Sequence, residues 1–330
     1  MEKITFQCET ITPMFLAGAD GKTPELRPPS IKAAMRFWWR AMHGDLSLSD
    51  LKKDEAKIFG GSGENEGRSK FSIRIKHDLK ISNQNISGNY IAKNPDWYKY
   101  SVSLNKPIKV NPIEYLGYGP YNFKDKWQKY IPANSKFEIT IIVHNTDFKE
   151  EIVDSFRYLA SFGALGSKSR NGFGKIKILN EEYLSLEKLK SSTKASTYSH
   201  ISSDIRIFKL QNNFDTWERT IAKLGEIYRY AKVEADGEKH KYDKRKFIAA
   251  PVKKDVFVRK TKPYFFNIWK YGNKQYSGFI LYMPYFELIS DKEIYTRGFN
   301  TDFPTELKNA CDTLNYKILS FDREIEEVIL

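Results

Sequence analysis

A glycine-rich loop at residues 163–174 combines residue types that can bind an anion. Its sequence is GALGSKSRNGFG, and it follows an amphipathic segment and precedes a short apolar one. Glycine allows positive φ and close approach to another surface, which we expect of Gly166 and Gly172, and exposed N–H groups in such a loop bind anions. Lys168 and Arg170 add positive charge. The loop therefore predicts a phosphate-bearing ligand.

Other interpretations of this loop fit less well. A helix C-cap accounts for Gly163 alone. A dinucleotide fingerprint needs a strand before the glycines and a helix after them, whereas here the predicted order is reversed. A Walker-type loop needs Gly-Lys-Ser/Thr at the start of a helix, and residues 166–168 lack that context. Binding of an RNA backbone is the leading interpretation.

A predicted helix at Ile31–His43 carries a second candidate set. At about 100° per residue, the helix has two faces. The apolar face, expected to pack on a sheet, consists of Ile31, Ala34, Met35, Trp38 and Met42. The opposite face consists of Lys32, Arg36, Trp39, Arg40 and His43. We interpret it as a phosphate track, extended by Arg27, with Trp39 or His43 available for base stacking; a solvated surface is the alternative.

The charge balance agrees with a polyanionic partner. The chain has 54 Lys and Arg against 41 Asp and Glu, a net charge of +13, and 15% aromatic residues. Basic excess attracts nucleic acid, and aromatic rings among cations suit stacking on unpaired bases, although the charge could serve solubility alone. No apolar run approaches the roughly 20 residues that span a bilayer, so no membrane partner is expected. Cys8 and Cys311 form no metal motif or disulfide framework, which favours a reducing cytoplasm and predicts no metal or cofactor.

The first half of the chain shows an alternation of strands and helices. The expected elements are strand Lys3–Ile11, helix Ile31–His43, a strand containing Phe71, Ile73 and Ile75, strand Phe137–His144, helix Lys149–Phe162 and strand Phe173–Leu179. This β-α-β-β-α-β order is that of a ferredoxin-like unit, whose four-stranded sheet is a common RNA-binding scaffold.

The second half resembles a degenerate copy of the first. Its expected elements are strand Ile205–Leu210, helix Phe214–Lys232, strands Phe247–Val258, Tyr264–Tyr271 and Tyr276–Pro284, and helix Thr305–Lys317. The predicted class is α+β, with two ferredoxin-like domains in tandem. We predict a first domain at 1–180 with an insertion at about 77–135, a Ser/Thr-rich linker at 181–203 and a second domain at 204–330.

Three motifs resemble the RAMP superfamily of CRISPR proteins. They are TPMFLAGA at 12–19, ELRPPSIKAAMRFWWR at 25–40 and the glycine loop. The second motif is similar to one branch of that family, subunit one of the Cmr complex, the type III-B effector. These motifs cover roughly residues 4–178, and RKFIAAP at 245–251 resembles a weaker family block. The Lys/Asn/Tyr-rich insertion at 77–135 departs from the family pattern.

The resemblance implies two fused ferredoxin-like domains and a non-catalytic RNA-binding subunit for antiviral defence. Such a subunit would hold the 3′ region of the crRNA and help to capture single-stranded target RNA, beside other Cmr-type RAMP subunits. Arg27, Lys32, Arg36 and Arg40 match the family's basic helix, and Lys168 and Arg170 match its basic loop. The expected RNA-binding set is Arg27, Lys32, Arg36, Trp39, Arg40, His43, Gly166, Lys168, Arg170, Gly172 and Lys175.

A metal-independent endoribonuclease that processes CRISPR RNA is the alternative function. Such cleavage needs a general base and acid, commonly histidine, around the 2′-OH. The histidines are His43, His77, His144, His200 and His240. Only His43 lies in the basic constellation, where stacking is the favoured role. Asp20 has no evident partner for metal binding, and we expect no catalytic or metal-ligating residue.

Overall fold

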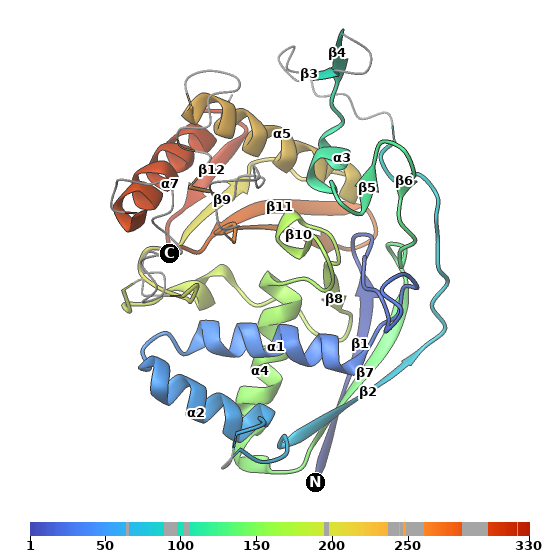
Figure 1. Ribbon diagram of the computed structural model, residues 1–330. Helices are drawn as coiled ribbons and strands as arrows, with labels where there is room; N and C mark the ends of the chain where they lie inside the picture. Colours follow the sequence, from blue (N-terminus) through green and yellow to red (C-terminus); the bar gives the residue numbers. More distant parts are fainter. Residues whose placement is uncertain are drawn as a thin grey trace.

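The computed structural model describes residues 1–63, 66–88, 98–101, 106–194, 198–236, 244, 247–248, 261–285, 303–321 and 323–330. Two four-stranded antiparallel sheets organise it (Figure 1). No described helix is both long enough and apolar enough to cross a bilayer. Both cysteines, Cys8 and Cys311, are free and buried.

The first sheet has the strand order β2-β7-β1-β8. Its strands are β1 (Glu2–Thr10), β2 (Phe71–His77), β7 (Lys136–Val143) and β8 (Ile176–Ile178). Its helices are α1 (Pro28–Met42), α2 (Leu48–Phe59) and α4 (Lys149–Phe162). The alternation of apolar and polar residues sets the pairing register of the strands. Phe6, Ile139 and Ile75 are aligned across three strands, and all three face the helices.

The second sheet repeats this arrangement, with the order β10-β11-β9-β12. Its strands are β9 (Arg206–Leu210), β10 (Tyr264–Tyr271), β11 (Gln275–Tyr282) and β12 (Ile325–Val328), and its helices are α5 (Trp217–Ala235) and α7 (Phe303–Leu319). Counted along the chain, the third strand of each sheet lies between the first and second strands. The fourth strand lies on the other side of the first. The predicted fold class is therefore confirmed.

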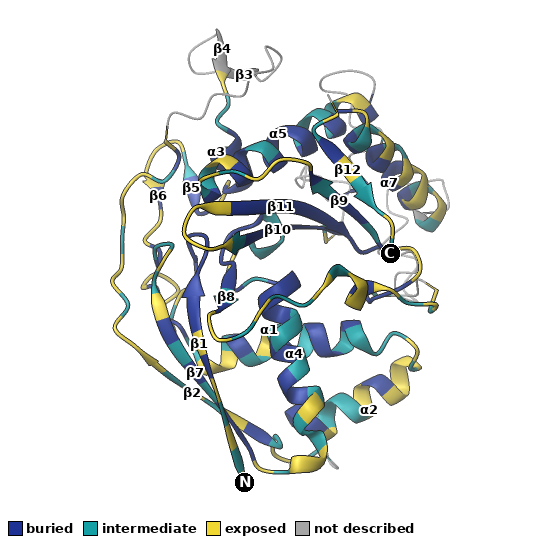
Figure 2. Cartoon of the chain, turned by 180° about the vertical axis from the view of Figure 1, so that it is seen from behind, coloured by how far each residue is buried: buried dark blue, intermediate teal, exposed yellow. Residues whose placement is uncertain are grey.

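The second sheet is covered on both faces, unlike the first (Figure 2). Successive residues of β10 point to opposite sides. Phe265 and Trp269 join α1 and α4 in one core, whereas Phe266 and Ile268 join α5 and α7 in the other. Helices α1 and α4 thus lie between the two sheets. The outer face of the first sheet carries polar residues such as Lys3, Thr5, Gln7, Ser72, Arg74 and Lys76.

The segment between β2 and β7 forms short elements, one of which reaches the second domain, by which we mean β9 to β12 with their helices. They are β3 (Tyr98–Ser101), β4 (Lys106–Lys109), α3 (Pro112–Leu116), β5 (Tyr121–Asn122) and β6 (Lys126–Trp127). Helix α3 packs on α5, where Leu116 contacts Gly225. The 3-10 helices are Thr146–Phe148, Ser169–Asn171 and Leu186–Leu189.

Most predicted elements of the chain are present within a few residues of their expected bounds. The sequence patterns missed α2 and β12, and β8 is shorter than predicted because Phe173 and Gly174 belong to the glycine loop. The strand predicted at Phe247–Val258 lies outside the described residues, except for Phe247 and Ile248, which form a turn.

Candidate nucleic-acid interface

The glycine loop makes its close approaches within the chain. Gly166 and Gly172 have φ of +87° and +88°, as the sequence predicted. A Cβ on Gly166 would lie 2.5 Å from the Phe15 carbonyl oxygen, and one on Gly172 would lie 3.2 Å from Ile221 Cδ1 in the second domain. Gly172 is buried. The Cβ side of both glycines therefore faces other parts of the chain, and contact of these glycines with RNA stays a prediction.

Two side chains of the loop tie it to the second domain and to the insertion. The Arg170 guanidinium donates to the Lys262 carbonyl and lies 4.2 Å from the Phe265 ring centroid. Burial lowers the pKa of Arg170 to about 10. Asn171 Nδ2 donates to the Leu116 carbonyl at 2.6 Å, which connects the loop to α3. The loop is thus a junction between three parts of the molecule.

Lys175 is a structural residue of this junction, which corrects its assignment to RNA. It is fully buried, and its Nζ donates to the carbonyls of Ser161 and Gly163 and to Asn267 Oδ1, at 2.7 Å from the last. Three acceptors match the three protons of an ammonium group. Burial lowers the pKa of Lys175 to about 7. It joins β8 and α4 to β10 and cannot reach a ligand.

Four cations converge where the glycine loop meets the second domain: Lys168, Arg170, Lys232 and Lys262. The Lys262 and Lys232 ammonium groups lie 4.8 and 5.4 Å from the centroid of one ring, that of Tyr228. Burial and then the charges of Lys232, Arg170 and Lys168 hold the pKa of Lys262 well below its usual value. Among the residues that the structure describes, no carboxylate pairs with Arg170, Lys232 or Lys262. We call these four residues the junction cations.

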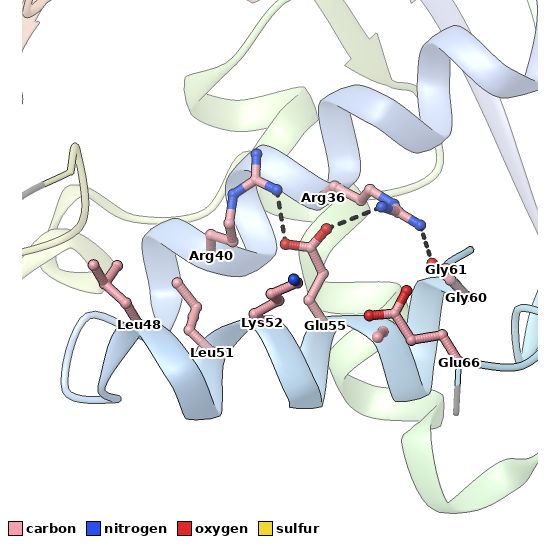
Figure 3. A pocket seen from close by; sticks show the side chains of 10 residues that line it. Arg36, Arg40, Leu48, Leu51, Lys52, Glu55, Gly60, Gly61 and Glu66 are labelled. Carbon is pink, nitrogen blue, oxygen red and sulfur yellow. Dashed lines mark hydrogen bonds and ion pairs between the residues drawn. The ribbon is translucent and has the colours of Figure 1, made fainter. Parts of the chain in front are cut away.

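The cations of α1 have different surroundings (Figure 3). Arg36 and Arg40 both pair with Glu55 of α2, at 3.1 and 2.7 Å. Arg36 also donates to the carbonyls of Phe59 and Gly60. The hollow between the two helices is roughly 220 Å³, below the usual size of a small-molecule site. The predicted phosphate track is therefore partly neutralised by α2.

Trp39 does not offer an exposed ring for base stacking, which corrects the expectation from the helical wheel. It is 1% exposed, and its Nε1 donates to Glu151 at 2.9 Å. The His43 ring stacks on it at 4.2 Å between centroids. His43 Nδ1 is 2.7 Å from the Trp39 carbonyl oxygen, and its Nε2 is 3.6 Å from Glu151. Both imidazole nitrogens therefore face acceptors of the chain.

The remaining candidates of α1 lie at its start. Arg27 occupies the N-cap position before two prolines and lies 3.9 Å from Glu25. Lys32 Nζ is 5.0 Å from the Phe71 ring centroid, and burial together with Arg36 lowers its pKa. Both side chains are partly exposed. Arg27 and Lys32 therefore remain available to an anion, whereas the buried Trp39 ring is not available for base stacking.

Sequence reasoning missed Lys232 and Lys262. They are distant from the loop in sequence and reach it because β10 packs beside the 3-10 helix Ser169–Asn171 and α5 packs on β10. No local pattern marks them. Among the described residues, no group of three or more His, Cys, Asp or Glu could hold a metal ion.

The fold and the loop together define a class: two β-α-β-β-α-β units in tandem, with a glycine-rich basic loop between the second helix and fourth strand of the first unit. The chain belongs to the RAMP superfamily, whose sequence profile matches residues 7–177.

Relatives of this chain carry the names of Cmr subunits. The CRISPR system Cmr subunit Cmr1-2 of Pyrococcus furiosus is 28% identical over 195 residues, covering 54% of this chain and 96% of that protein. Cmr1-1 of the same organism is 27% identical over 205 residues, covering 61% of this chain and 55% of that protein. The crystal structure of apo Cmr1 from P. furiosus matches with a TM-score of 0.58 and 21% identity, over 99% of this chain and 98% of that one, so the fold is shared. The predicted resemblance is confirmed.

Proposed function

We propose that this chain is a non-catalytic RNA-binding subunit of a type III-B Cmr effector. In that complex it would hold the 3′ region of the crRNA and the target RNA beside other Cmr-type subunits. Membership of the RAMP superfamily and similarity to two Cmr subunits support the assembly. The observation that carries RNA binding is the set of junction cations.

Like charges in a partly buried place repel one another and lose hydration, so an anion that joins them relieves both costs. A phosphate is such an anion, and RNA presents phosphates in series along its backbone. The Lys262 pKa, lowered by burial and by its three cationic neighbours, reports this crowding. The junction also lies between the two domains, where a strand of RNA can contact both.

The surroundings of His43 support the non-catalytic part of the proposal. A general base must present a free nitrogen to the 2′-OH. His43 instead directs Nδ1 to the Trp39 carbonyl and Nε2 towards Glu151. The imidazole is thus stacked on Trp39 and bonded to its carbonyl, which supports a structural role.

Incubation of the purified chain with labelled single-stranded RNA, with and without Mg²⁺, tests the proposal. We expect saturable binding whose affinity falls steeply with salt, and intact RNA on a denaturing gel. Binding that is insensitive to salt would contradict a phosphate site. Cleavage that is lost in His43→Ala would favour the endoribonuclease and overturn the non-catalytic role.

A further inference from the structure

The turn at residues 117–124 of the insertion presents two aromatic rings to solvent beside the glycine loop. Tyr118 is 61% exposed and Phe123 is 50% exposed. Tyr121 of the same turn and Trp127 just after it are buried, so the exposed rings are not left over from a loose segment. Trp127 Nε1 donates to Ser87 Oγ at 2.8 Å, which anchors the turn.

The turn is fixed next to a junction cation. A Cβ built on Gly119 would lie 3.3 Å from Lys168 Cε and 3.5 Å from its Nζ. The Gly119 and Tyr121 amides donate within the turn at 2.9 Å, and Asn171 of the glycine loop bonds the carbonyl of Leu116 just before it. The backbone at Gly119, the residue after Tyr118, therefore lies beside the Lys168 ammonium group.

The charge around these rings favours a polyanion over an apolar partner. Residues 117–130 contain three lysines and one aspartate, and all four are exposed. Rings beside cations form the usual site for unpaired bases, since the rings stack on bases while ammonium groups contact phosphates. Protein-docking aromatics instead lie at the centre of patches depleted in lysine.

We propose that Tyr118 and Phe123 form a stacking platform for single-stranded RNA whose backbone lies against Lys168. This inference rests on the proposed RNA-binding function and assigns part of that function to the insertion. The platform takes the role that the helical wheel had given to Trp39. It is tolerant of base identity, because every base has an aromatic face.

Fluorescence anisotropy with labelled single-stranded RNA, and with an abasic strand of equal length, tests the platform. The variants are Tyr118→Ala, Tyr118→Phe, the Tyr118→Ala/Phe123→Ala pair and the control Tyr316→Ala, which removes a tyrosine of α7 that is 68% exposed. Tyr118→Ala should weaken RNA binding about fivefold or more with the salt slope unchanged, because the ring carries no charge. Tyr118→Phe and Tyr316→Ala should bind like the unmodified chain. The abasic strand should bind all variants equally.

Three results would overturn the platform. If the unmodified chain binds RNA and the folded double variant binds equally well, the platform is wrong and the RNA-binding function stands. If the unmodified chain does not bind RNA, both proposals fall. If the double variant keeps its RNA affinity but no longer joins the other Cmr subunits, the turn is a protein contact instead.

Discussion

The cations of α1 and the junction cations differ in the acids around them. Arg36 and Arg40 share the carboxylate of Glu55, whose side chain is 12% exposed. Lys262 has Asn171 Oδ1 and two aromatic rings as partners. A stripe of cations on a helix is therefore a weaker sign of RNA binding than Arg170, Lys232 and Lys262, which pair with no carboxylate among the residues that the structure describes. The surrounding acids, rather than the number of lysines and arginines, distinguish structural charge from binding charge.

Lys175 tests the boundary between structural and binding charge within the junction itself. Lys175→Met should lower the free energy of unfolding by about 2–4 kcal/mol, because it leaves buried acceptors unsatisfied, while RNA affinity stays within about twofold. Urea denaturation and RNA titration measure the two effects. A stable variant with weak RNA binding would show that Lys175 serves the ligand.

The pH dependence of the same variant sharpens this test. The folded pKa of Lys175 is about 7 and the ordinary value is 10.5, so between these values the unfolded chain binds more protons than the folded chain. Stability from this group therefore rises with pH across that window. We expect the stability difference between the unmodified chain and Lys175→Met to be larger at pH 9 than at pH 7. A difference that shrinks with pH would contradict the lowered pKa.

A direct comparison of the two cation groups uses paired variants. The double variant Lys168→Gln/Lys262→Gln keeps hydrogen-bond donors while removing two charges. It should weaken RNA binding about tenfold and reduce the slope of log affinity against log salt concentration by roughly 1.4. Arg36→Gln/Arg40→Gln, the matched control, should change affinity by less than about threefold because Glu55 already compensates those charges. If Arg36→Gln/Arg40→Gln lost more RNA affinity than the junction variant, the phosphate track predicted on α1 from the sequence would be supported instead.

Glu55 gives the smallest effect and the finest test. Glu55→Gln frees Arg36 and Arg40 from their shared carboxylate, so RNA affinity should rise about two- to threefold if α1 borders the RNA path. The loss of both ion pairs should cost about 1 kcal/mol in stability. Unchanged affinity in a folded variant would place α1 away from the RNA path.

Sequence patterns predicted the strands and helices well because burial imposes their periods. Alternation located β1, β2 and β7, and the α4 bounds agreed at both ends. The helical-wheel prediction placed Trp39 wrongly on an exposed face, because the angular position of a residue does not show which part of the chain covers that face. Here the ring lies in the core with Phe59 of α2, a helix that the patterns had missed.

The candidate site was predicted only in part. Glycine types predicted the positive φ of Gly166 and Gly172, but which surface approaches them depends on packing that brings Phe15 and Ile221 close. The loop cations were found from the sequence. Lys232 and Lys262 join them only through the fold, and no short motif could reveal them.

The double coverage of the second sheet bears on how the chain is made at the ribosome. Phe37, Trp38 and Phe162 of the first domain contact Phe265 and Trp269 of β10. As the N-terminal half emerges first, these aromatic residues stay uncovered until residues 264–271 have been synthesised. We therefore expect the N-terminal half to expose apolar aromatic surface during translation, until the second half of the chain buries it.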